Sequence, residues 1–169
     1  MPYRSVTTFF LIAFAMIASA SHEAEAAQSG SWSVSGKCKR LVVRNERLTE
    51  VCAGEIRQTR YADGTVTLQF SDGQNWLLFR GKQASIRLFG GYKTFIDLDG
   101  VAFGKIGAEP VFQEKLAGAA CYYAAPYRGE AVVSCSAIVN FQMWAATVET
   151  DGRLPVPDNE YIQPTLSAP

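Results

Sequence analysis

Histidine is almost absent from this chain of 169 residues, because the only one is His22, close to the N-terminus. Without another imidazole, the chain lacks the usual Ser-His-Asp or Cys-His catalytic groups and a histidine ligand for a transition metal. A phosphate-binding loop is also missing, since the glycines stand singly or in pairs at the ends of strand-like runs. These absences argue against most histidine-dependent hydrolases, nucleotide-binding enzymes and metalloenzymes.

An excess of one charge is missing as well, since 16 basic and 16 acidic residues balance. A neutral chain has no global field to attract nucleic acid, so we expect no nucleic-acid partner. One stretch is locally basic: Lys37, Lys39, Arg40, Arg44 and Arg47. We favour a solvated strand edge, which such charges protect from aggregation. The alternative is a contact for lipopolysaccharide, anionic glycan or an acidic partner.

Long hydrophobic runs are absent too. Residues 9–18 are apolar, whereas a membrane-spanning helix needs about 20 such residues. This run follows Arg4 and precedes two small-x-small motifs, Ala18-Ser19-Ala20 and Ala24-Glu25-Ala26. That order is typical of a cleaved export signal. We therefore predict a signal peptide at 1–26 and a periplasmic or secreted mature protein without a transmembrane segment.

Cysteine is scarce, but its spacing is informative. Four cysteines follow the export signal: Cys38, Cys52, Cys121 and Cys135. In an oxidising compartment they are expected to form disulfides, and three pairings are possible. Cys38 with Cys52 and Cys121 with Cys135 have the same separation, and each pair flanks a turn-like centre. We predict these two local disulfides.

The turn-like centres set the expected geometry of the two cysteine loops. A hairpin centred on Arg128 would place Tyr123 opposite Val133, and Cys121 opposite its partner. A bend at Asn45 would close the first loop in the same way. Each loop holds about 15 residues, and closing it is worth ~3 kcal/mol in the chain-entropy model. A zinc site of four free thiols would need C-x-x-C spacing, which the chain lacks.

The fold class follows from residues 65–80, where two alternating runs flank Asp72-Gly73. Such a pair between strand-like runs is a strong hairpin signal, because a type I′ turn needs positive φ at both central residues. Pairing Ser71 with Gln74 places five apolar side chains on one face of the hairpin: Val66, Leu68, Phe70, Leu77 and Phe79. This face is expected to form a wall of the core.

Short strand-like runs with glycine-containing turns continue to residue 150. We therefore predict one all-β domain at 27–151, an antiparallel barrel or sandwich of about 8–9 short strands. Asp99-Gly100 is expected to separate two of these strands. Residues 104–120 form either one or two helical turns or a loop, so at most one short helix is expected. The proline-containing segment 152–169 has little to bury and is predicted to be disordered.

The candidate site residues are contacts rather than catalysts. Trp76 and Leu78 lie on the more polar face of the hairpin, where tryptophan could anchor a partner. We favour the alternative that another strand or a crossing loop covers them. Tyr127 and Arg128, at the turn of the second cysteine loop, are further candidate partner contacts.

Acidic residues offer little more. Asp97-Leu98-Asp99-Gly100 resembles half of a calcium loop, with possible ligands at alternate positions, but it lacks the distal glutamate. A strand that ends in a turn explains this segment better. We therefore predict no metal, no cofactor and no catalytic residue.

The two cysteine loops resemble a group of small exported alphaproteobacterial proteins. The resemblance rests on Leu-Ala-Gly-Ala-Ala-Cys at 116–121, Pro-Tyr-Arg-Gly at 126–129 and Val-Val-Ser-Cys-Ser-Ala at 132–137. The first loop, from Cys38 to Gly54, is similar to the same group. The resemblance implies periplasmic or secreted placement, and it carries over no reaction and no catalytic residue.

The sequence therefore predicts a non-catalytic exported domain of the cell envelope that acts by binding or by structure. Its partner would be a protein or an envelope glycan. One alternative is a small inhibitor of proteases or lysozyme, which would use the braced loop at 126–130. A second alternative is a carboxylate-dependent glycan hydrolase, which needs two acidic side chains about 5–9 Å apart in a cleft.

Overall fold

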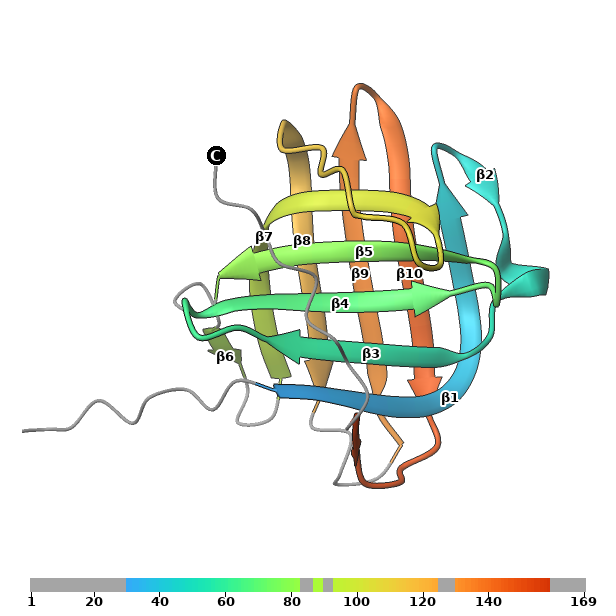
Figure 1. Cartoon of the computed structure of the whole chain (residues 1–169), viewed down its shortest axis with the longest axis vertical. Helices are drawn as coiled ribbons and strands as arrows, with labels where there is room; N and C mark the ends of the chain where they lie inside the picture. Colours follow the sequence, from blue (N-terminus) through green and yellow to red (C-terminus); the bar gives the residue numbers. More distant parts are fainter. Residues whose placement is uncertain (1–29, 83–86, 90–92, 125–129, 159–169) are drawn as a thin grey trace, which may run out of the picture.

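Eight antiparallel strands close into a barrel in the computed structural model, which describes residues 30–82, 87–89, 93–124 and 130–158 (Figure 1). Neighbouring strands follow the order β10-β9-β8-β7-β5-β4-β3-β1, and β1 pairs with β10 to close the ring. The barrel strands are β1 (Gly30–Val43), β3 (Glu55–Arg60), β4 (Thr65–Ser71), β5 (Asn75–Lys82), β7 (Lys93–Lys105), β8 (Leu116–Ala124), β9 (Val132–Val139) and β10 (Gln142–Thr150). The predicted all-β class is confirmed, with the barrel as the architecture.

Three shorter strands attach to this ring. They are β2 (Glu46–Arg47) and β11 (Val156–Pro157), which pair with β1, and β6 (Arg87–Phe89), which pairs with β7. One 3-10 turn, η1, covers Thr49–Val51. An irregular segment follows it, and β3 begins at Glu55.

Two long strands join two five-stranded sheets. β1 pairs with β3 through Ser35 and with β10 from Gly36 onward. β7 pairs with β8 through Asp97 and with β5 from Leu98 onward. In Figure 1, β3, β4 and β5 run across the front of the barrel, and β8, β9 and β10 lie behind them at a steep angle. The barrel is thus two sheets packed nearly at right angles, which share β1 and β7 as corners.

Glycine allows the bend at the β1 corner. A Cβ on Gly36 would collide with backbone atoms of β10, including the carbonyl oxygen of Glu149 and, at 2.7 Å, the Cα of Thr150. Gly36 is therefore the point at which β1 leaves β3 and comes close to β10. A side chain at this position would push the two strands apart.

The β7 corner corrects one prediction. Asp99-Gly100 was expected to end a strand, but both residues lie inside β7. Arg80 pairs with Gly100 and Gly81 with Leu98, so Asp99 is the extra residue of a β-bulge. A bulge and a turn use similar residues, and here the strand bends between sheets without ending.

The central hairpin has the predicted faces but a different register. Ser71 pairs with Trp76 instead of Gln74, so the connection is longer than the predicted two-residue turn. The Asp72 side chain accepts hydrogen bonds from the backbone N–H groups of Gln74 and Asn75, at 2.8 and 2.5 Å, and shapes this longer loop. The register shift is two residues, which preserves the alternation of faces. The predicted apolar wall is therefore correct.

Side chains from both sheets meet in one hydrophobic cluster inside the barrel. Phe70 of β4 and Phe79 of β5 pack edge to face, with ring centroids 5.9 Å apart. Ile96 of β7, Cys121 of β8 and Val148 of β10 belong to the same cluster and are at most 1% exposed. An eight-stranded barrel has an interior just wide enough for side chains to fill. Among the residues that the structure describes, these buried side chains form a packed core.

The segment before β8 is a loop, which decides between the two alternatives for residues 104–120. Gln113 exchanges two backbone hydrogen bonds with Val101, N–H to O at 2.8 Å and O to N–H at 3.1 Å. β8 pairs with β7 only as far as Asp97, so the next part of this β7 edge needs another partner. The extended loop supplies it, and a helix could not.

The C-terminal segment also differs from its prediction. Residues 152–158 were assigned to a disordered tail, yet Val156–Pro157 pair with β1 at Trp32 and Ser33. The N–H of Asp158 donates to the Ser31 carbonyl at 2.9 Å, and the Asp158 carboxylate pairs with Arg57 at 2.6 Å. The prediction is wrong for these residues. The remainder of the predicted tail, 159–169, and the predicted signal peptide, 1–26, lie outside the described residues.

Candidate functional site

Both predicted disulfides are present. Cys121 and Cys135 face each other across β8 and β9, with Cα atoms 4.0 Å apart, and Tyr123 pairs with Val133 as predicted. Cys38 of β1 is bonded to Cys52, which follows η1, with Cα atoms 6.0 Å apart. The described residues therefore contain no free thiol to act as a nucleophile.

Trp76 is not an exposed anchor. Its side chain is only 6% exposed, although it points away from the barrel interior. The ring lies over Gly104 of the neighbouring strand, where a Cβ would come within 2.7 Å of it. Leu78, the next outward residue of β5, is half-buried. The favoured alternative, in which other parts of the fold cover both side chains, agrees with this burial.

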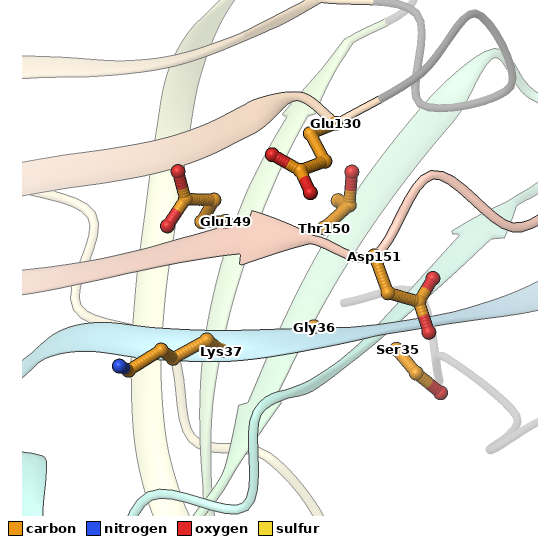
Figure 2. Close-up of a pocket in the computed structure, with 7 residues that line it drawn as sticks. All are labelled: Ser35, Gly36, Lys37, Glu130, Glu149, Thr150 and Asp151. Carbon is orange, nitrogen blue, oxygen red and sulfur yellow. The ribbon is translucent and has the colours of Figure 1, made fainter.

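The other two predicted partner contacts cannot be placed. Tyr127 and Arg128, with most of the loop at 126–130, lie outside the described residues. Glu130, at the end of that loop, is described and exposed. It lines a pocket at the β1 corner of the barrel (Figure 2).

This pocket is a solvent-open depression of about 410 Å³. It is lined by residues of β1 and of the segments that end β10 and precede β9: Ser35, Gly36, Lys37, Glu130, Glu149, Thr150 and Asp151. Gly36, where β1 and β10 approach each other closely, is one of these lining residues. Two hydrogen bonds connect Thr150 to the segment before β9. The Thr150 N–H donates to the Ala131 carbonyl at 2.7 Å, and the Thr150 hydroxyl oxygen accepts from the Ala131 N–H at 3.0 Å.

The three carboxylates of the pocket do not converge. In Figure 2 the side chains of Glu130 and Glu149 extend to one side, and that of Asp151 extends to the other. The ammonium group of Lys39 lies 2.5 Å from the Glu149 carboxylate, and this hydrogen bond lowers the pKa of Glu149. A glycosidase acid needs a raised pKa. Glu149 is thus suited to remain a charged surface group.

Metal coordination finds no support in the same region. Among the residues that the structure describes, no group of three His, Cys, Asp or Glu side chains is arranged to hold a metal ion. Asp99 at the β7 corner has another role, since it binds Arg80 with an Nε–Oδ1 distance of 2.6 Å. The calcium-loop resemblance at 97–100 is therefore explained by a bulge whose carboxylate pairs with a neighbouring strand.

Arg80 forms the centre of a second polar group on the outer wall. It bonds Asp99 and also Glu114, at 3.0 Å, and its guanidinium lies 4.2 Å from the centre of the Phe112 ring. Burial alone would lower the pKa of Arg80, but the hydrogen bonds to the two carboxylates outweigh it and raise the pKa. Since Phe112 and Glu114 belong to the loop before β8, this group fastens that loop to β5 and β7.

A third region was missed in the sequence. The β1–β2 and β9–β10 turns lie at the same end of the barrel (Figure 1), and one of them carries Phe141, whose side chain is 99% exposed. Positive φ values occur at Arg44 and Asn45 in one turn and at Asn140 and Phe141 in the other, as in type I′ turns. The Asn45 N–H donates to the Met143 carbonyl at 3.0 Å, and the Met143 N–H donates to Asn45 Oδ1 at 2.8 Å. The two turns are thus joined.

We call six exposed residues of these two turns and of the adjoining strand ends the tip surface: Arg40, Arg44, Arg47, Ile138, Phe141 and Met143. Ile138 and Met143 face each other on the outside of β9 and β10 and are 42% and 37% exposed. The Arg40 guanidinium lies against the Met143 sulfur, and the Arg44 guanidinium lies 5.4 Å from the Trp144 ring centre. Basic and apolar side chains therefore adjoin at this end of the barrel.

The arginines of the tip surface belong to the basic cluster that we interpreted as a strand edge. Asn140 between two alternating runs indicates a turn, because asparagine tolerates the left-handed conformation.

No protein-family model matches the chain, and neither a curated protein nor a solved structure matches it.

Proposed function

We propose that the protein is a non-catalytic, exported domain of the cell envelope that acts by binding a macromolecule through its outer surface. The observation that carries this proposal is the packed interior. Eight-stranded barrels that hold a small ligand keep an internal cavity, whereas here Phe70 and Phe79 and their neighbours occupy the centre. A partner would have to be recognised from outside.

Export is part of the proposal. It is supported by the order of basic, apolar and small residues at 1–26 and by two disulfides, which persist in oxidising compartments. The resemblance to small exported alphaproteobacterial proteins agrees with this placement. No helix in the described part of the chain is long and apolar enough to cross a membrane.

A protease or lysozyme inhibitor is a second candidate within the same class of function. The joined turns at the tip surface favour it, because turns that are fixed to each other before binding lose little conformational entropy when they enter a cleft. The loop at 126–130, which the sequence suggested for this role, lies outside the described residues.

The proposal is tested by assaying the secreted, disulfide-bonded protein for turnover of peptidoglycan, soluble glycans and unstructured peptides. We expect no turnover by the wild-type protein. Hydrolysis that disappears in Glu130→Gln or Glu149→Gln, while Glu109→Gln, at an exposed carboxylate outside the pocket lining, retains it, would overturn the non-catalytic function. Recovery of the chain from the cytoplasm with residues 1–26 attached and its thiols reduced would overturn export.

A further inference from the structure

We propose that the tip surface docks into a cleft of a protein partner, with Phe141 in an apolar pocket and the arginines facing carboxylates at the rim. This inference rests on the proposed function and names its site and the chemistry of its partner. It commits to a folded protein whose cleft is apolar at the bottom and acidic at the edge.

The backbone at Phe141 is the first support. Its φ of 63° lies in the left-handed region, which bulky residues rarely adopt, and the second central residue of a type I′ turn is usually glycine. The ring is 99% exposed, so burial in the fold does not compensate for this conformation. An unfavourable conformation at an exposed aromatic residue is a reason to look for a function outside the fold.

Charge is the second support. Segments 40–47 and 138–143 carry Arg40, Arg44 and Arg47 against the single acidic residue Glu46. Within the described part of the chain, none of these arginines forms an ion pair with a carboxylate. Arg40 instead contacts the Met143 sulfur and Arg44 lies over an aromatic ring. The tip surface therefore has a net positive charge available for an acidic partner.

Composition and rigidity favour a protein over a lipid surface. Aromatic residues, methionine and arginine are enriched at the centres of protein interfaces, and the tip surface contains all three. The hydrogen bonds between Asn45 and Met143 fix the relative position of the turns before binding. An excess of two positive charges gives only weak attraction to anionic lipid.

Photo-crosslinking in the organism that encodes the chain tests the proposal. The photoreactive amino acid p-benzoylphenylalanine replaces Phe141 in the full chain, and it replaces Val111, which is 75% exposed, in the control. We expect a protein adduct at 141 and none at 111. The adduct should fall at least tenfold with Arg44→Glu plus Arg47→Glu, but stay constant with Arg153→Glu near the opposite end of β10. Mass spectrometry should identify a partner with an acidic cleft.

Every other outcome contradicts part of the account. An adduct at 111 but not at 141 would keep the binding function and overturn the tip surface as its site. An adduct at 141 whose yield is unchanged by Arg44→Glu plus Arg47→Glu would overturn the inference that the partner's cleft has an acidic rim. Adducts with lipid, or binding to vesicles of phosphatidylglycerol and phosphatidylcholine, would replace the protein partner by a membrane. Adducts at neither position would overturn docking at the tip surface.

A stability measurement needs no partner and separates binding from folding. Phe141→Gly places glycine at the left-handed position and should raise the urea midpoint of unfolding. The same variant, made in a chain that carries the photoreactive residue at Ile138, should reduce the adduct at least tenfold. A lower urea midpoint would mean that Phe141 serves the fold, and the proposal would be wrong.

Discussion

The two disulfide loops have the same sequence separation of 14 but occupy different environments. Cys121 and Cys135 lie inside the barrel, 0% and 1% exposed, at directly opposite positions of β8 and β9. Cys38 and Cys52 are half-buried, and they tie the β1 corner to the irregular segment before β3. Both disulfides close loops of the same length, so their loop-closure contributions to stability are equal. A difference between the two disulfides in the free energy of unfolding therefore measures the contribution of the surrounding packing.

Removal of the interior disulfide, Cys121–Cys135, should cause the largest decrease in the free energy of unfolding. Replacing both Cys121 and Cys135 by alanine removes about 3 kcal/mol of loop-closure stabilisation. It also removes two buried sulfur atoms, which adds about 1–2 kcal/mol of lost burial and cavity formation. We expect a decrease of about 4–5 kcal/mol in the free energy of unfolding, measured by urea denaturation. A loss no larger than that of the other pair would contradict the role of packing.

Removal of the Cys38–Cys52 disulfide should cause a smaller decrease in the free energy of unfolding. Alanine at both positions removes the same loop-closure contribution, about 3 kcal/mol, with little additional packing because both side chains are half-buried. Amide hydrogen exchange should rise around η1 and leave the paired part of β9 protected. If exchange rose equally in β9, the two loops would not be independent regions.

The corner next to Cys38 provides the next test. Gly36→Ala places a Cβ against backbone atoms of β10, which cannot move aside as a side-chain end could. Overpacking of this kind costs about 1–3 kcal/mol, and the loss should appear in urea unfolding. Ser35→Ala is the matched control, because Ser35 is the exposed neighbour. Equal stability of Gly36→Ala and wild type would show that the β1 corner is not closely packed.

The smallest effect concerns charge at the same corner. The hydrogen bond from Lys39 lowers the pKa of Glu149 below its ordinary 4.5. A lowered pKa in the folded state means that this contribution is present above pH 4.5 and is lost as the pH falls through the folded value. NMR titration of the Glu149 carboxyl group should show a higher pKa in Lys39→Met than in the wild type. An unchanged midpoint would mean that the pair does not persist in solution.

Local signals in the sequence were sufficient for the disulfide pairing and for the faces of the central hairpin. Equal cysteine spacing around turn-like centres identified both loops, and alternation identified Val66, Leu68 and Phe70 as core. The register of that hairpin was wrong by two residues. A slip of two leaves every side chain on the same face, so alternation could not reveal it.

The remaining features depend on contacts between distant segments. The extra residue at Asp99 lies where Arg80 pairs with Gly100 and Gly81 pairs with Leu98, and a bulge cannot be distinguished from a turn in one sequence. Ordering of Val156–Pro157 requires β1 as a partner. The tip surface was missed because Phe141 adopts a turn conformation that its own side chain disfavours.

The central claim is that the packed barrel binds from outside, and titration with the fluorescent apolar probe N-phenyl-1-naphthylamine tests it most directly. We expect no saturable fluorescence from the wild-type protein. Phe79→Ala should gain binding because it opens space beside Phe70, and Leu68→Ala serves the same purpose if the first variant does not fold. Saturable binding by the wild type, displaced by a fatty acid, would show a ligand cavity and contradict the account.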